Sequence, residues 1–314
     1  MDAWIDGRFV PQDQATVPLL SHGFSRGVAV FEVADVPVNE RGPAVFRLDA
    51  HLDRFFESCR LLHMPVRIGR DELKAAVLGT VAHNGLYPCA VKFFAYGPEV
   101  EFNLIPARPR VSVAVFCYQS HEERRSGAPV APVAAGTAGV HKLSPRTAAV
   151  HAKASGNYVN AYLAAWEARE NGYEEALLLD ESGFVCEGPL ANVFFASAGR
   201  AVTPPLEKVL GGITRDSVIR ILRDLDVDVA EADITLEDAV GADEGFYTGS
   251  TARIVPIRSI DGQPLAGECP GPVTARIHKA LNDAYAGRSP GYEHWLSYVD
   301  GASGPQGAPG VPSE

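Results

Sequence analysis

The break in periodicity between residues 119 and 140 constrains the fold of this 314-residue chain more than any other feature. Charged residues at the start of this stretch are followed by Gly, Pro and Ala, and its apolar residues recur at neither helical nor strand spacing. The pattern predicts a small N-terminal domain over residues 1–121, an interdomain linker over 122–140 and a large domain over 141–300. Residues 301–314 are rich in Gly, Pro and Ser, which predicts a disordered tail.

The first half of the chain mixes short strands with helices. Residues 3–10 predict a hairpin that turns at Asp6-Gly7, and residues 111–118 alternate as a half-buried strand does. Asp49 is the expected N-cap of a helix that runs to about residue 64. A second helix is expected over residues 70–83, because Asn84-Gly85 follows as a stop signal.

The second half shows the same mixture. A helix is expected over 157–170 and another over 214–226, with strands over 175–180 and 192–197. The first of these helices has Val159, Tyr162, Leu163 and Trp166 on one face, and the second has Val218, Ile221, Leu222 and Leu225 on its inner face. The fold class is therefore α/β or α+β, which the sequence does not separate.

Composition excludes several classes of function. The net charge of -11 argues against nucleic acid as the main partner, because phosphate backbones demand clustered Lys and Arg. No apolar run approaches the length of a membrane span, and the N-terminus has no signal-peptide pattern. The five cysteines are widely spread without a CxxC pair, which predicts reduced thiols, a cytoplasmic location and no structural zinc site.

Lys153 is the first candidate for chemistry. It stands in the run His151-Ala152-Lys153-Ala154-Ser155-Gly156, where small neighbours leave room for a large group beside its amine. A lysine does covalent work when burial or a neighbouring cation lowers its pKa. A solvated surface lysine is the common alternative.

Glu187 is the second candidate, because an acid flanked by apolar residues on a predicted strand needs a partner. A protonated ring nitrogen such as that of pyridoxal 5′-phosphate (PLP) would be one, since a carboxylate normally holds it. A structural ion pair with an Arg is an equally open reading of this motif.

Two turns could hold a phosphate. Leu210-Gly211-Gly212-Ile213-Thr214 leads into a predicted helix, and a helix start offers free N–H groups and a positive dipole end. Thr248-Gly249-Ser250-Thr251 is a hydroxyl-rich turn after an apolar strand. A simple glycine turn with Thr214 as N-cap is the alternative for the first of them.

Taken together and in this order, these elements resemble the class IV aminotransferases, the branched-chain and D-amino-acid aminotransferase family of PLP fold type IV. The resemblance runs from about residue 3 to about residue 262. It also rests on these motifs: Ser21-His22-Gly23, Val30-Phe31-Glu32, Phe46-Arg47, His51-Leu52-Asp53-Arg54, Gly156-Asn157-Tyr158 and Asn192-Val193-Phe194.

The resemblance implies a two-domain fold, a homodimer with shared active sites, and a role for each matched residue. Lys153 would be the Schiff-base lysine that moves the substrate proton, Glu187 would pair with the ring nitrogen, and Tyr158 would bond the 3-oxygen. Arg54 would bind the phosphate as a charge-assisted fork. The remaining cofactor contacts would come from Asn192, Ile213, Thr214, Ser250 and Thr251.

Substrate recognition departs from the branched-chain pattern, in which a small-domain strand carries Tyr-x-Arg. The corresponding stretch here is Ala90-Val91-Lys92, and Arg26 stands where a tyrosine is usual. The two cations could clamp an α-carboxylate, although an interface ion pair of Arg26 is as good a reading. Phe31, Ser250 and Thr251 complete the expected substrate site.

The resemblance implies an aminotransferase that uses a branched-chain L-amino acid or a D-amino acid as donor and a 2-oxo acid as acceptor. The alternative is a PLP-dependent lyase of the same fold, resembling 4-amino-4-deoxychorismate lyase. A non-catalytic binding protein would have no use for the lysine, the glutamate and the phosphate turns together.

Overall fold

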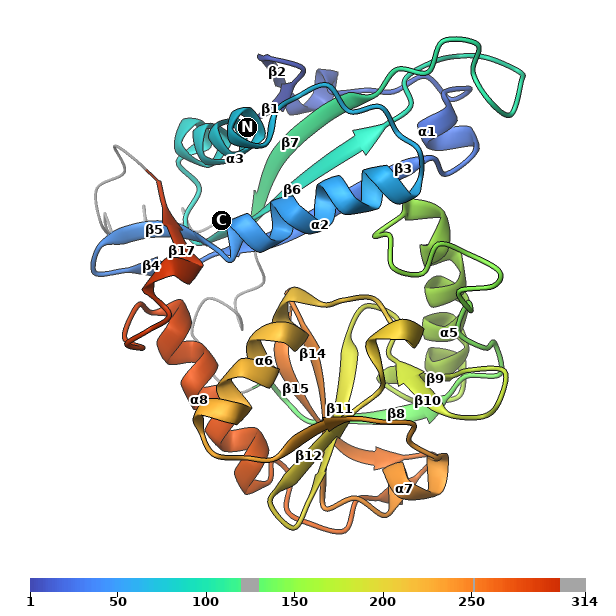
Figure 1. The fold of residues 1–314 in the computed structure, drawn as a ribbon, viewed down its shortest axis with the longest axis vertical. Coiled ribbons are helices and arrows are strands. Elements are labelled where there is room, and N and C mark those ends of the chain that lie inside the picture. The colour runs from blue at the N-terminus through green and yellow to red at the C-terminus, as the bar shows by residue number, and fades with distance from the viewer. Residues whose placement is uncertain (120–129, 251, 300–314) are drawn as a thin grey trace, which may run out of the picture.

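The computed structural model describes residues 1–119, 130–250 and 252–299. Thr251 and the predicted tail at 301–314 lie outside these ranges. The described residues form mixed sheets and helices, as the α/β (α+β) prediction required (Figure 1). None of the helices in these ranges has the length and apolar character that crossing a bilayer requires.

The first sheet is antiparallel, and its five described strands run in the order β2-β1-β7-β6-β3. The bounds are β1 Asp2–Ile5, β2 Arg8–Pro11, β3 Ala29–Val36, β6 Cys89–Tyr96 and β7 Ser112–Gln119. The hairpin at Asp6-Gly7 is confirmed, since both residues have the positive φ that a tight turn needs. The helices α2 (Leu48–Leu61) and α3 (Arg70–Asn84) pack on this sheet and close the first apolar core.

The N-cap of α2 differs from the prediction. The cap position is Arg47, whose φ of 54° lies in the left-handed region, and the helix begins at Leu48. Asp49 instead lies in the first turn, where its carboxylate accepts bonds from Lys74 at 2.9 Å and stabilises the contact between α2 and α3.

The second sheet is built from the rest of the chain, and its nine described strands include a closed ring. The bounds are β8 Val133–Thr137, β9 Glu175–Leu179, β10 Val185–Glu187, β11 Asn192–Ser197, β12 Arg200–Thr203, β13 Val229–Glu231, β14 Glu244–Gly249, β15 Arg253–Ile260 and β16 Gln263–Pro264. Pairing runs β8-β9-β10-β11-β14-β15 and returns to β8, so six strands close on themselves. The pair Glu187↔Asn192 joins β10 to β11 at one seam of the ring.

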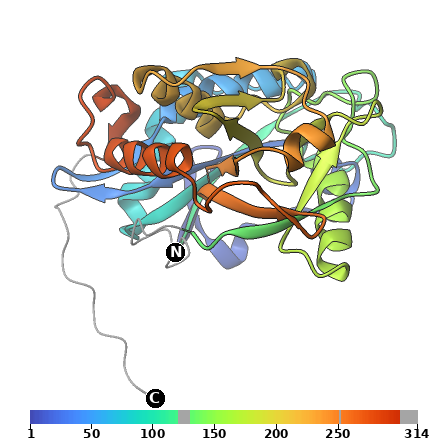
Figure 2. The same ribbon diagram turned by 90° about the horizontal axis from the view of Figure 1, so that it is seen from below.

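Helices α5, α6, α7 and α8 lie around the ring, whereas the short helix α1 lies against the end of β6 in the first sheet (Figure 1). The bounds are α1 His22–Ser25, α5 Tyr158–Glu170, α6 Ile213–Asp224, α7 Leu236–Val240 and α8 Pro272–Tyr285. Short 3₁₀ turns cover Gln12–Gln14, Ser155–Asn157, Leu206–Lys208 and Glu293–Trp295. Figures 1 and 2 both place α5 and α8 on opposite sides of the molecule, and Figure 1 shows α2 between the two sheets.

The apolar face of α5 points to solvent, although an apolar stripe along one face of a helix usually packs against the core. Val159 and Tyr162 each expose 63% of their area, and Trp166 exposes 49%. The buried side of the helix is formed by Ala164 and Ala168, whose small side chains allow close packing on β9. Within one chain, nothing that the structure describes covers the larger side chains.

Two details depart from the predicted domain ranges, whose boundaries at 121 and 141 stay a prediction. Residues Val133–Thr137, expected in the linker, form β8 between β9 and β15. The late strand β17 (Leu296–Tyr298) pairs with β5 (Gly42–Phe46), which also pairs with β4 (Val38–Asn39). The end of the described chain therefore returns to the first half.

Candidate active site

A cavity of about 450 Å³ lies between the first sheet and the ring. Its wall includes Phe31, Lys92 and Phe94 from the first sheet, and segments around residues 153, 187, 213 and 249 from the second half of the chain. A volume of this size suits a cofactor-sized ligand enclosed by apolar walls and a few polar groups.

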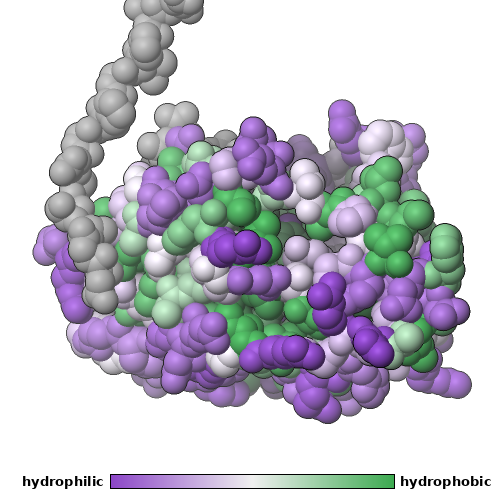
Figure 3. All heavy atoms as spheres, turned by 90° about the horizontal axis from the view of Figure 1, so that it is seen from above, coloured by the Kyte–Doolittle hydropathy of each residue, from purple (hydrophilic) through white to green (hydrophobic). Residues whose placement is uncertain are grey.

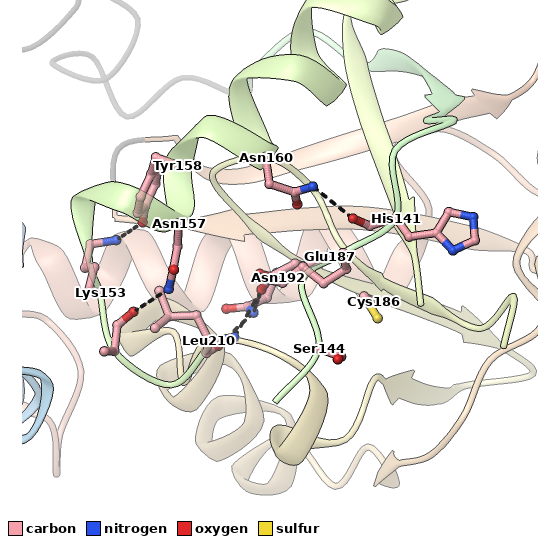
Figure 4. A network of polar contacts seen from close by, with 12 residues as sticks. His141, Ser144, Lys153, Asn157, Tyr158, Asn160, Cys186, Glu187, Asn192 and Leu210 are labelled. Carbon is pink, nitrogen blue, oxygen red and sulfur yellow. Dashed lines mark hydrogen bonds and ion pairs between the residues drawn. The ribbon is translucent and has the colours of Figure 1, made fainter. Parts of the chain in front are cut away.

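Lys153 is held on this wall by its backbone. Its N–H donates to Ser58 Oγ of α2 at 3.0 Å, and its carbonyl accepts from the N–H of Phe31 on β3 at 3.1 Å. Its Nζ lies 2.8 Å from the hydroxyl of Tyr158 (Figure 4). Burial and the neighbouring Arg54 guanidinium lower the pKa of Lys153 to about 8, which raises the fraction of neutral, nucleophilic amine near neutral pH.

Tyr158 begins α5 and faces the same amine. Burial raises the pKa of its phenol, so the side chain is a neutral hydrogen-bond partner. Its ring lies 4.8 Å from that of Phe31, which fixes the hydroxyl beside Lys153.

Glu187 lies at the seam of the ring, and both of its oxygens have donors. Asn192 Nδ2 donates to Oε2 at 3.0 Å, and the N–H of Leu210 donates to the same oxygen at 3.3 Å (Figure 4). Lys142 Nζ lies 2.9 Å from Oε1. The sequence predicts Glu187 and Asn192 as site residues but contains no local motif that indicates Lys142.

Arg54 reaches the cavity from α2 and is oriented by a buried acid. Its Nε and one terminal nitrogen donate to the two oxygens of Glu32 at 2.7 Å, and its other terminal nitrogen donates to Gly211 O at 2.8 Å. His51 Nδ1 also lies 2.7 Å from Glu32. Burial acts to raise the pKa of Glu32, but the Arg54 and His51 contacts outweigh it and lower the pKa to about 2. The sequence places Glu32 in the Val30-Phe31-Glu32 motif but does not predict this role.

The N-terminus of α6 forms a cradle next to Arg54. Gly212 is the N-cap, without a side-chain capping bond, so the first N–H groups of the helix are available to an anion. A Cβ at Gly212 would meet Asn192 Oδ1 at 2.0 Å, so a larger residue here would displace the Asn192 side chain that bonds Glu187. Thr214 is therefore not the N-cap; it is buried one residue inside the helix.

The opposite side of the cradle carries a buried hydroxyl that has no partner. Thr248 Oγ1 lies on the cavity wall and makes no hydrogen bond among the described residues. An unpaired buried hydroxyl is costly unless a ligand or ordered water completes it. With Arg54 and the α6 N-terminus, it fits a phosphate-sized anion at this end of the cavity.

The predicted site residues fall into three groups. Most of them line this one cavity: Phe31, Arg54, Lys92, Lys153, Tyr158, Glu187, Asn192, Ile213, Thr214 and Ser250. Arg26 is exposed at the end of α1 and is not among the cavity-lining residues of its own chain. Thr251 lies outside the described residues.

A buried lysine amine next to an anion cradle is the arrangement of enzymes that use lysine as a nucleophile toward a phosphorylated ligand. Residues 29–260 match the family model described as amino-transferase class IV. The chain therefore belongs to the class IV aminotransferase family and is an aminotransferase.

Proteins with established names are similar to this chain over almost its whole length. The branched-chain-amino-acid aminotransferase of Pseudomonas aeruginosa is 31% identical over 301 residues, which cover 94% of this chain and 96% of that protein. The crystal structure of the branched-chain aminotransferase from Thermoproteus uzoniensis with norvaline has a TM-score of 0.90 at 35% identity, covering 95% and 99% of the two chains. A T.th. branched-chain amino acid aminotransferase, complexed with N-(5′-phosphopyridoxyl)-L-glutamate, has a TM-score of 0.89 at 36% identity, covering 95% and 98%.

Proposed function

We propose that this enzyme transfers the amino group of an amino acid to a 2-oxo acid with PLP held between Lys153, Glu187 and the α6 N-terminus. The observation that carries the proposal is the low-pKa amine of Lys153 in one cavity with an anion cradle that has an unpaired hydroxyl. The T.th. relative binds a phosphopyridoxyl amino acid, which supports the same cofactor here.

Each residue has a task in this proposal. Arg54, the N–H groups at Ile213 and Thr214, and the Thr248 hydroxyl bind the phosphate. Glu187 accepts a hydrogen bond from the protonated ring nitrogen, and when bound the ring supplies a sink for the electrons left at the substrate Cα. Lys153 Nζ would hold the cofactor in place and would then move the proton from the substrate Cα. Its lowered pKa suits this work near neutral pH.

The substrate is a small amino acid with an apolar side chain. Phe31, Val33, Phe94 and Tyr118 line the cavity on the side of the first sheet. Lys92 lies among them, with Nζ 4.6 Å from the Phe31 ring and 4.7 Å from the Phe94 ring. It is the cation nearest to a bound carboxylate in this proposal, and the relatives named for branched-chain amino acids support an aliphatic donor.

We also propose a homodimer in which Arg26 contributes to the neighbouring site. Large apolar side chains are exposed around α1 and in the loop after β6: Leu19, Leu20, Phe24, Val100, Phe102, Leu104 and Ile105. Figure 3 shows apolar side chains gathered at the side of the molecule where α1 lies in Figure 1. A patch of this kind typically marks a protein interface.

We further propose a cytoplasmic location. The five cysteines form no disulfide, which is typical of proteins in a reducing compartment.

A half-reaction tests the activity. The purified protein with PLP is mixed with single L- or D-amino acids without an acceptor, and the visible absorbance of the cofactor is followed. An aminotransferase converts the bound cofactor stoichiometrically to its amine form and releases the 2-oxo acid. A protein that leaves the cofactor in its aldehyde form with every amino acid, and releases pyruvate when given 4-amino-4-deoxychorismate, would be the lyase instead.

A further inference from the structure

Lys142 is a second lysine on the cavity wall, in the segment after β8. Its Nζ and Glu187 Oε1 are 2.9 Å apart, and the two side chains expose only 13% and 11% of their area. Its N–H donates to Leu179 O at 2.8 Å, and Asn160 Nδ2 donates to the carbonyl of the preceding His141 at 2.9 Å (Figure 4). The backbone is therefore fixed on both sides, and the ammonium is held against the carboxylate.

The donors to Glu187 come from three separate segments. Lys142 occupies Oε1, while Asn192 of β11 and the N–H of Leu210 occupy Oε2. An ionised carboxylate has about four acceptor positions, so one remains for a further donor. Because Glu187 lines the cavity, that donor can be a ligand.

We propose that Lys142 is a positioning residue that acts on the bound cofactor through Glu187. It orients Oε1 so that the remaining acceptor position meets the ring nitrogen. Its ammonium also partly neutralises the negative charge of the carboxylate. Glu187 consequently holds the ring proton less tightly than an unpaired carboxylate would. This inference rests on the proposed function.

Other titratable groups interact with Glu187 but do not share this contact. Lys153, Tyr158 and Cys186 each interact with it electrostatically from their own segments. Among the described residues, Lys142 is the one whose side chain forms an ion pair with Glu187. Truncating Lys142 therefore removes the cation that offsets the carboxylate.

The test is a pH titration of the visible absorbance of the bound cofactor in wild type, Lys142→Met, Lys142→Gln and Lys142→Arg. Without the ammonium, Glu187 acts with its full charge and stabilises the protonated nitrogen that joins Lys153 to the cofactor. The midpoint should rise by roughly one pH unit in the Met and Gln variants. Lys142→Arg retains the charge and should keep the wild-type midpoint. If the Met variant does not fold, Lys142→Gln, which retains a donor, carries the test.

Two controls isolate the route through Glu187. Lys208→Met removes a cation that pairs with Asp180 rather than with Glu187, and it should leave the midpoint unchanged. In a Glu187→Gln background, Lys142→Met should shift the midpoint by less than half as much. An unchanged midpoint in both Lys142→Met and Lys142→Gln, or an equal shift in the Glu187→Gln background, would overturn the inference.

The failure of this inference is distinguishable from that of the proposed function. Borohydride reduction and peptide mapping of wild type show whether PLP binds at Lys153. If wild type carries no label there, the proposed function fails. If it does, and Lys142 variants titrate like wild type, only the role of Lys142 is wrong.

Discussion

Replacing Glu32 by Gln should destabilise the protein and loosen the phosphate cradle at the same time. Glu32 is fully buried and receives bonds from Arg54 and His51 at 2.7 Å. The glutamine would retain one oxygen and would point an N–H₂ group at a guanidinium, which leaves a buried cation without its partner.

The magnitude follows from the pKa of Glu32. Its value falls from 4.5 to about 2 in the folded protein, and at about 1.36 kcal/mol per unit this corresponds to roughly 3 kcal/mol of folding free energy. Because the folded pKa is lowered, this stability is present above the unfolded value and is lost as the pH falls from about 4.5 toward about 2. The difference between wild type and variant should shrink across that window.

Urea unfolding of the apoprotein at several pH values measures the loss of unfolding free energy. A titration with PLP measures the affinity of the cradle for the cofactor. Cofactor affinity should weaken about tenfold, as expected when a charge-assisted bond is misaligned. Glu57→Gln is the matched control, since Glu57 makes the same two-bond contact with Arg60 on the same helix but is exposed. Exposed pairs contribute little. If Glu32→Gln unfolds no more easily than Glu57→Gln, the reasoning from burial is wrong.

Three further changes test the site. Lys153→Ala should still bind PLP through the cradle, but borohydride should fix no label; a label on Lys142 or Lys92 in wild type would contradict the assignment. Glu187→Gln should retain PLP and lose on the order of a hundredfold in turnover, about 2.7 kcal/mol in barrier, as single-turnover kinetics would show. Arg26→Ala should raise the half-saturating concentration of amino and 2-oxo acids by roughly 10- to 150-fold. An equal effect on amines without a carboxylate would place Arg26 in the interface instead.

The motif-bearing parts of the site could be predicted from the sequence, because their chemistry is local. Lys153 with Tyr158 and the Gly211-Gly212 helix start each occupy one short segment, and the structure brings them to one cavity. Lys142 could not be found this way, because its partner Glu187 is distant in sequence and meets it only through the pairing of β9 and β10.

The sequence does not state which neighbours bury a segment, and this explains two differences between the predicted and the observed elements. The sequence does not predict strand β8, because Val133–Thr137 is rich in small residues and does not alternate. Its position in the ring buries Ala134, Ala135 and Gly136. The apolar spacing in α5 predicts the helix correctly, but spacing alone does not say which neighbour covers the apolar face. Here the alanine side of the helix packs on its own chain.

The packing of β5 against α8 has a consequence for substrate entry. Phe46 of β5 stacks on Tyr285 of α8 with centroids 3.7 Å apart and meets Trp295 edge-on, so both halves of the chain share one apolar core. A hinge that swung β5, together with the first sheet, away from the ring would expose these aromatic rings to water, at a free-energy cost of several kcal/mol. Substrate exchange should therefore proceed by rearrangement of side chains and loops at the cavity mouth while the two sheets keep their spacing, and turnover should be insensitive to crosslinks between β5 and α8.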